Sequence, residues 1–167
     1  TTDQTRYVYL SDGGHFENLA LYEMVFRRCG LVVLVDAGCD PKYEYEDLAG
    51  AVRKIRTDMG IPITFSGLPR PAGEKEPESH YGIGTIHYTE VGEDRDGTII
   101  YIKPVLTGDE DVDVRRYAAA HKKPKNPFPQ QSTMDQFFDE AQFESYRKLG
   151  EHSVLKLFKQ KGGSTTH

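Results

Sequence analysis

The residues with the clearest chemical potential in this chain are a carboxylate and two glycines that follow a short apolar run. Residues 7–10 (YVYL) favour a strand, because aromatic and β-branched side chains suit a pleated surface. Asp12 comes next, with Gly13 and Gly14 directly behind it, and glycines permit positive φ angles and a close turn. Because side chains at strand ends meet ligands in open α/β folds, we expect Asp12 at the mouth of a sheet, where it can accept a proton.

A helix is expected directly after this turn. Asn18 is a candidate cap for it, and Glu17 is expected to bind backbone amides at the helix start, where negative charge is favourable. Apolar residues cover most of the circumference of residues 19–26, which predicts a buried helix. The continuous apolar run 31–35 is typical of a parallel strand buried on both faces. Together these elements predict a βαβ unit.

The string SDGGHFENLALYE at residues 11–23, with the arginine pair and apolar strand behind it, resembles the C-terminal part of bacterial patatin-like phospholipases. The segments 97–107 and 128–146 are also similar to the tail of large bacterial members. The resemblance implies that Asp12 pairs with a serine on a tight strand-to-helix turn. It further implies that this pair hydrolyses acyl esters of lipids.

The same resemblance places Gly13 and Gly14 in the active-site loop, where His15 borders the substrate cleft or is a loop histidine with local partners. Two features that the family needs are absent from this sequence, the G-x-S-x-G nucleophile turn and the glycine-rich oxyanion loop. A serine becomes a good nucleophile only when a nearby base accepts its proton, so Asp12 alone cannot act. We therefore expect a C-terminal fragment of a longer protein, inactive in isolation, whose upstream part supplies the serine.

Simpler structural explanations also exist for these residues. An aspartate before two glycines is ordinary turn chemistry, in which the carboxylate accepts hydrogen bonds from backbone amides two residues on. His15 and Glu17 form an H-x-E pair, but two ligands fall short of the three or four that a metal site needs. The sequence therefore predicts no metal and no cofactor.

Composition limits the partners and the compartment. The net charge of −5 argues against a nucleic-acid-binding face, which is normally basic. The resemblance to patatin-like phospholipases implies a lipid or ester as the substrate of the full-length protein. Cys29 and Cys39 are too few for a disulfide framework. The sequence contains no signal peptide or apolar run long enough to span a bilayer, so we expect a cytoplasmic or peripherally membrane-associated protein. Any membrane contact is expected through the upstream part of the polypeptide.

The rest of the chain predicts a single α/β domain over residues 1–167, in four sections. Residues 1–65 form a βαβαβ core, whose second helix (45–59) has an apolar stripe at spacings of four and three. Residues 66–80 are rich in proline and glutamate and predict a mobile loop. Residues 81–103 predict a β-hairpin at the sheet edge, and residues 104–167 a helical tail. The expected architecture is a partial three-layer α/β/α sandwich with a mainly parallel sheet.

Aromatic residues gather in the tail, after a capping-box pattern at Thr133 and Gln136. They form a lipid-binding lid or, as we favour, pack a terminal helix against the domain; they are Phe137, Phe138, Phe143 and Tyr146. A fragment of a larger sheet is also expected to expose apolar surface.

The alternative function is a noncatalytic α/β interaction or regulatory domain. Two strand-end aspartates, Asp12 and Asp36, are similar in outline to those of phosphoacceptor receiver domains, but no strand-end lysine is evident from the sequence.

Overall fold

The computed structural model describes residues 6–7, 12–73, 79–122 and 126–161. Its elements, in chain order, are η1 (Gly13–His15), α1 (Leu21–Phe26), β1 (Leu31–Val35), α2 (Glu46–Met59), β2 (Ile63–Phe65), β3 (Tyr81–Ile86), η2 (Tyr88–Val91), β4 (Gly97–Ile102), α3 (Val112–Ala120) and α4 (Glu140–Lys161). The α/β class predicted from the sequence is confirmed. The strand expected at residues 7–10 lies outside the described residues.

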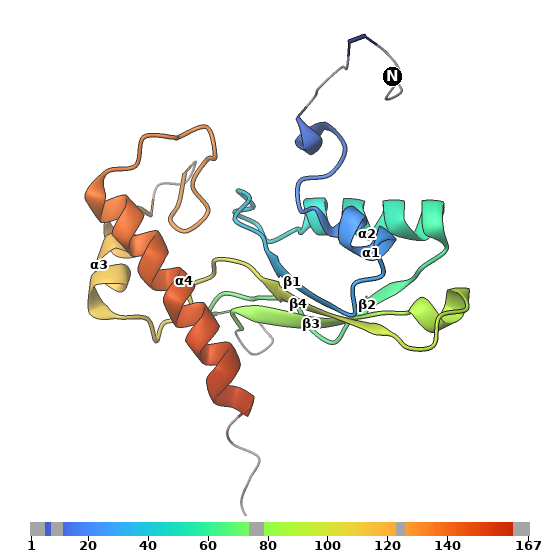
Figure 1. Ribbon diagram of the computed structural model, residues 1–167. Coiled ribbons are helices and arrows are strands. Elements are labelled where there is room, and N and C mark those ends of the chain that lie inside the picture. The colour runs from blue at the N-terminus through green and yellow to red at the C-terminus, as the bar shows by residue number, and fades with distance from the viewer. Residues whose placement is uncertain (1–5, 8–11, 74–78, 123–125, 162–167) are drawn as a thin grey trace, which may run out of the picture.

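Among the described residues the sheet has four strands, in the order β1-β4-β3-β2 (Figure 1). β1 pairs with β4 in parallel, whereas the β4–β3 and β3–β2 pairs are antiparallel. Three strands therefore share one direction, but the sheet is mixed rather than mainly parallel. The β3–β4 hairpin is confirmed, yet it lies inside the sheet and not at its edge. The reason is that the apolar strand β4 pairs on both sides, which separates β1 from β2.

Helices α1 and α2 cover one face of this sheet (Figure 1). The helix predicted at 45–59 is confirmed as α2, whose buried stripe consists of Leu48, Ala51 and Ile55. Gly60 ends the helix with a φ of 70°, a left-handed conformation that glycine adopts without strain. The core between helices and sheet contains the buried side chains Leu21, Val25, Val32, Leu34, Leu48, Ile55, Ile86, Ile99 and Tyr101.

The opposite face of β1 is open. Val32 and Leu34 are buried under the helices, but Leu31, Val33 and Val35 are 61%, 57% and 64% exposed. The prediction of a strand buried on both faces is therefore wrong, because no second helix layer covers this face in the described part of the chain. Of the expected three-layer sandwich, one helix layer and the sheet are present. The expected exposed apolar surface is thus found on β1.

Helix α1 is shorter and less buried than the sequence predicts. It begins at Leu21, and Leu21 and Val25 are buried on the side that faces the sheet. Phe26 is 63% exposed, so the expectation of a helix buried all round is wrong. The cause is again the single helix layer, since α1 has the sheet on one side and solvent on the other.

Helices α3 and α4 pack together beside the sheet and share a second, smaller core of Val114, Ala118, Phe128 and Leu149 (Figure 1). α4 begins at Glu140, so the capping box at Thr133 and Gln136 does not start it. The described part of the 66–80 segment is hydrogen-bonded, because Arg70 and Ser79 exchange two backbone hydrogen bonds of 2.7 and 3.0 Å.

Candidate functional site

Asp12 lies in an exposed turn at the start of η1. Its Oδ1 accepts a hydrogen bond from the backbone amide of Gly14 at 2.9 Å, which is the turn chemistry considered from the sequence. His15, at the end of η1, is exposed. Asp12 does not line any of the four cavities of about 390, 330, 680 and 220 Å³, which other residues form. Asp12 is therefore open to an approaching group, but the described residues do not enclose it in a cleft.

The two glycines of this loop differ in what they contribute. Neither has a positive φ, so the conformational reason expected for them does not apply. A Cβ added at Gly14 would lie 2.6 Å from Oδ1 of Asn18 and 3.3 Å from Oδ1 of Asp12, which is too close. A Cβ at Gly13 would meet nothing within 4 Å. Of the two glycines in the Asp12 loop, close packing therefore requires glycine at Gly14 and not at Gly13.

Glu17 caps the start of α1, as the sequence predicts. Its carboxylate accepts hydrogen bonds from the backbone amides of Leu19 and Tyr22, the latter at 3.2 Å. The prediction that Asn18 caps this helix is wrong, because Ala20 occupies the N-cap position and makes no side-chain cap bond. The Glu17 carboxylate already satisfies the amides that a cap would bind.

Asn18 instead ties the Asp12 loop to α2. Its Nδ2 donates to Oδ1 of Asp47, in the first turn of α2, at 3.2 Å. Lys54 on the same helix donates to the backbone carbonyl of Phe16 and lies 4.6 Å from the centre of the Phe16 ring. Two contacts with α2 therefore hold the loop that carries Asp12 against this helix.

A second polar group, which the sequence did not reveal, lies where β1 and β4 end. We call Asp36, Tyr101 and Lys103 the strand-end cluster. Lys103 Nζ lies 3.0 Å from Oδ2 of Asp36, and both residues are buried. Tyr101 donates its hydroxyl to the same oxygen at 2.5 Å, and the Gly38 amide donates to Oδ1 at 2.8 Å. The parallel register pairs Val35 with Ile102 and so brings the next residue of each strand together.

Burial shapes the chemistry of the strand-end cluster. It raises the pKa of Tyr101 far above its usual value, and the hydrogen-bonded Asp36 carboxylate raises this pKa further. The Tyr101 hydroxyl therefore remains a donor at physiological pH. Because Asp36 receives donors from Tyr101, Lys103 and Gly38, its carboxylate is fully used in holding the two strand ends.

A polar cavity of about 390 Å³ opens beside the strand-end cluster. Asp36 and Lys103 line it from the sheet, and the loop after β1 and the first turn of α2 complete its wall. Asp47 lines this cavity and also accepts the hydrogen bond from Asn18, so one residue of α2 contacts both the cavity and the Asp12 loop. Cavities at the carboxyl ends of strands are where α/β folds bind ligands.

The structure has one feature of a receiver domain, a strand-end lysine, but it lacks an accessible phosphoacceptor aspartate at Asp36. Lys103 directly follows β4, so a strand-end lysine is present although the sequence did not make it evident. Asp36, however, is 3% exposed and is bonded to three donors. A phosphoacceptor needs an accessible oxygen, which this carboxylate does not offer.

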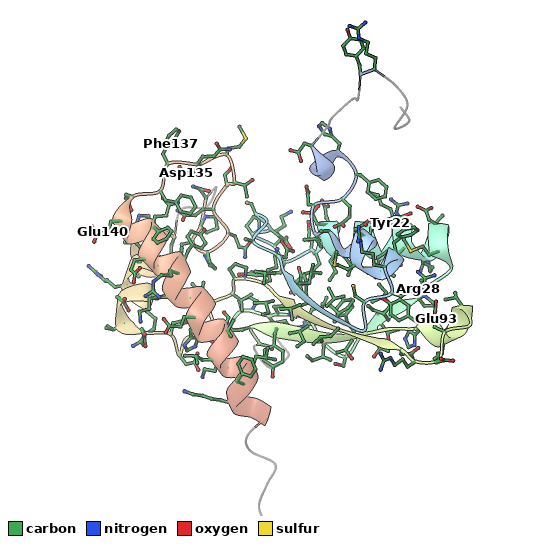
Figure 2. All side chains as sticks on the ribbon, viewed as in Figure 1. Tyr22, Arg28, Glu93, Asp135, Phe137 and Glu140 are labelled. Atoms are coloured by element: carbon green, nitrogen blue, oxygen red, sulfur yellow. The ribbon has the colours of Figure 1, made fainter. Side chains whose placement is uncertain are left out.

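The aromatic residues of the tail divide between packing and exposure. Phe138 stacks on Tyr146 with ring centres 5.6 Å apart, which supports the packing interpretation for that pair. Phe137 points into solvent from the loop before α4 and is 94% exposed (Figure 2), and Phe143 is 59% exposed. The expectation that all four aromatics pack against the domain is therefore wrong for these two. Phe137 lies on the loop before α4, and Phe143 lies on an exposed side of α4.

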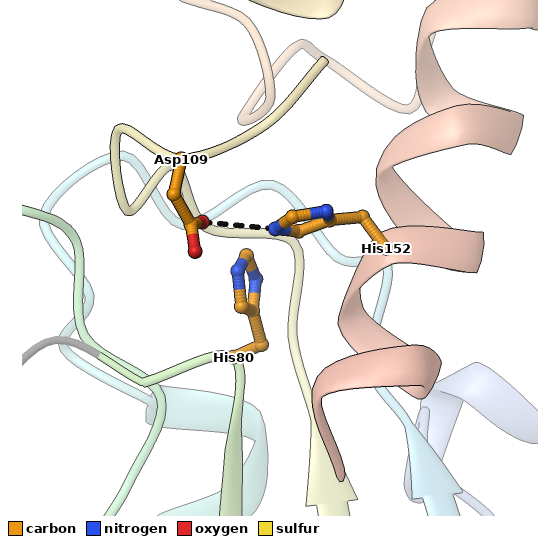
Figure 3. A group of neighbouring side chains, drawn as sticks. All are labelled: His80, Asp109 and His152. Atoms are coloured by element: carbon orange, nitrogen blue, oxygen red, sulfur yellow. Dashed lines mark hydrogen bonds and ion pairs between the residues drawn. The ribbon is translucent and has the colours of Figure 1, made fainter. Parts of the chain in front are cut away.

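The H-x-E pair of His15 and Glu17 does not form the metal-ligand group considered from the sequence, because backbone amides engage the Glu17 carboxylate. Three other side chains do come together, namely His80, Asp109 and His152 (Figure 3). They come from three distant segments, so no local spacing in the sequence indicates them.

No family model, curated protein or solved structure matches this chain. Within the ranges that the structure describes, no helix has both the length and the apolar character needed to cross a bilayer. The fold and the Asp12 loop define an α/β protein with an exposed carboxylate at the start of η1.

Proposed function

We propose that this chain is the C-terminal part of a patatin-like lipid acyl hydrolase, in which Asp12 is the general base for a serine supplied by the upstream polypeptide. The observation that supports this proposal is the accessibility of the Asp12 carboxylate. It is exposed, and its described hydrogen bond, from the Gly14 amide, engages Oδ1 only. The second oxygen faces no described donor, so a serine hydroxyl can approach it.

The open face of β1 supports a larger domain. In the part of the chain that the structure describes, β1 is an edge strand, and three alternating apolar side chains on its uncovered face, Leu31, Val33 and Val35, are more than half exposed. An apolar edge strand is normally paired or protected. Further strands and helices from the upstream polypeptide would bury this surface.

The chemistry also requires that upstream part. An exposed carboxylate is a weak base, and its basicity rises when water is excluded from it. An upstream segment that covers the Asp12 loop would supply this desolvation, together with the nucleophile and the oxyanion donors. In this proposal the isolated chain does not turn over substrate.

The expected substrate is a lipid or another carboxylic ester, and exposed apolar side chains of the tail are consistent with contact to such a molecule. Met134 and Phe137 are 88% and 94% exposed on the loop before α4. In this proposal the protein acts in the cytoplasm or at the membrane periphery, and stronger membrane contact comes from upstream regions.

The test is Asp12→Asn in the full-length protein, assayed by hydrolysis of a short-chain ester. We expect the rate to fall by about 10²–10⁴-fold, the usual contribution of a general base. Asp94→Asn is the matched control, since Asp94 is an exposed acid in the β3–β4 connection, and it should retain the wild-type rate. Near wild-type hydrolysis by Asp12→Asn would exclude Asp12 as the base.

A noncatalytic interaction domain remains the alternative proposal, because the open apolar face of β1 also suits a binding partner. The sequence encoded before Thr1 discriminates between the two. A glycine-rich loop and a G-x-S-x-G turn there would support the hydrolase, as would covalent labelling of the full-length protein by a fluorophosphonate. An unrelated upstream domain without labelling would support the interaction domain.

A further inference from the structure

A group of two histidines and one aspartate joins α4 to the sheet (Figure 3). His80 directly precedes β3, Asp109 lies between β4 and α3, and His152 is on α4. Their ligand atoms all lie within 4.8 Å of one another. The group joins β3, α4 and the loop after β4, whereas the Asp12 loop is bonded to α2, so the proposed site uses none of the residues assigned to the hydrolase chemistry.

One oxygen of Asp109 is the centre of this group. His152 Nε2 lies 2.9 Å from Oδ1 of Asp109, and the Thr107 hydroxyl donates to the same oxygen at 2.7 Å. Lys156 binds the other oxygen, Oδ2, and so directs Oδ1 toward the histidines. A carboxylate held in this way presents one oxygen to a ligand.

The His80 ring is held by two hydroxyl groups. Thr107 Oγ1 lies 2.9 Å from its Nε2 and Ser153 Oγ 3.1 Å from its Nδ1, and the ring packs edge-on against His152 with centres 5.0 Å apart. His80 is buried, and burial lowers its pKa to about 4. A bound metal ion would replace one of these two hydroxyl contacts, and the other would orient the ring as the outer partners of metal-bound histidines do.

We propose that His80, Asp109 and His152 bind a divalent transition metal ion, with Zn²⁺ as the best match. Two imidazole nitrogens and one carboxylate oxygen are a donor set that Zn²⁺ accepts, whereas Ca²⁺ and Mg²⁺ prefer oxygen ligands alone. The set also matches the three-ligand pattern of open zinc sites, which keep a fourth position for water.

The adjustment needed to hold the ion is small. Zinc–ligand bonds of about 2.0–2.2 Å in a tetrahedron separate ligand atoms by roughly 3.4 Å. The present separations are 2.9 Å between Asp109 and His152 and no more than 4.8 Å for the others, so side-chain rotations suffice. The loop that carries Asp109 is firm, because the buried Glu110 carboxylate accepts the backbone amides of Thr107 and Gly108.

The ion has a path into this site. Asp109 and His152 line a cavity of about 330 Å³, together with Lys156 and other residues of α4. His80 is 4% exposed and does not line this cavity, so the ion would reach it through Asp109 and His152. Water in this cavity would complete the coordination, and the bound ion would fasten α4 to β3 and to the loop after β4.

The test is Zn²⁺ titration of the chelator-treated full chain by calorimetry, with thermal unfolding as a second readout. We expect one ion per chain, and an unfolding temperature raised by about 5–10 °C when free Zn²⁺ is 100-fold above its dissociation constant. His152→Ala should weaken binding by more than about 100-fold and remove the temperature shift. His87→Ala is the matched control, since His87 contacts Thr64 and Asp96 outside the group.

Co²⁺ substitution keeps the proposal testable if His152→Ala unfolds. Wild-type protein should show the absorption bands of tetrahedral Co²⁺, and Asp109→Asn should weaken or lose them while the metal-free variant remains folded by circular dichroism. No heat and no shift with Zn²⁺ would overturn the proposal. Equal affinities in wild type and His152→Ala would also overturn it, because they would show adventitious surface binding only.

Discussion

Replacing Lys103 with methionine tests whether the strand-end cluster holds the sheet together. Methionine keeps most of the side-chain volume but removes the cation 3.0 Å from the Asp36 carboxylate. Lys103 and Asp36 are 1% and 3% exposed, so water cannot replace the lost charge. Tyr101 and Gly38 still donate hydrogen bonds, but neither neutralises the carboxylate.

The magnitude follows from this burial. Breaking a buried ion pair by removing one partner costs about 3–5 kcal/mol, because an uncompensated charge stays in the interior. For a chain of 167 residues this corresponds to a fall in unfolding temperature of roughly 6–20 °C. The double variant Asp36→Asn/Lys103→Met removes both charges and leaves the amide oxygen as an acceptor for Tyr101. It should therefore recover much of the lost stability, since neutral replacement of a buried pair is often tolerated.

The assay is urea unfolding followed by circular dichroism, with the free energy of unfolding obtained by linear extrapolation. Lys148→Met is the matched control, because Lys148 pairs with Glu151 at 3.4 Å on the exposed face of α4. It should change the unfolding free energy by less than about 1 kcal/mol. If Lys103→Met falls within the same range as this control, the reasoning about the buried pair is wrong.

Three further predictions concern the pH response, the Asp12 loop and the tail. Burial lowers the pKa of His80 from 6.5 to about 4, so the unfolded chain binds more protons than the folded chain between these pH values. The metal-free protein should therefore lose stability as the pH falls from 6.5 to 4. His80→Gln should reduce this pH dependence of the unfolding free energy, measured by urea unfolding. Gly14→Ala should destabilise the chain by about 1 kcal/mol, measured in the same way, whereas Gly13→Ala should be near neutral because its Cβ meets open space. Phe137→Ser should reduce vesicle co-sedimentation of the full-length protein without lowering its unfolding temperature, and unchanged co-sedimentation would exclude this side chain from lipid contact.

Local patterns were sufficient where a few neighbouring residues decide the structure. The apolar stripe of α2 and its terminal Gly60 predicted that helix, because a helix buries residues three and four apart on one face. The capping role of Glu17 was also predictable, since it depends on amides within five residues. The turn at Asp12 belongs to the same group, because its hydrogen bond reaches only to Gly14.

Local patterns were insufficient where burial depends on what covers an element. The run at β1 reads as a strand buried on both faces, but the same valines and leucines alternate between core and solvent in the fold. A sequence of neighbouring residues does not say how many layers lie above a sheet. The expected place of the β3–β4 hairpin failed for a related reason, because strand order is set by contacts between distant segments.

The amino-acid sequence by itself determined the α/β class, the main helix and strands, and the Asp-Gly-Gly turn with its capping glutamate, because these depend on side-chain periodicity and on hydrogen bonds between near neighbours. Tertiary structure alone decided that Asp36 meets Lys103 and that His80, Asp109 and His152 converge. Asp36 and Lys103 lie 67 positions apart in the sequence, and the members of the second group lie 29, 43 and 72 positions apart. Parallel strand register and the docking of α4 bring such residues together, and both arise from packing of the whole core.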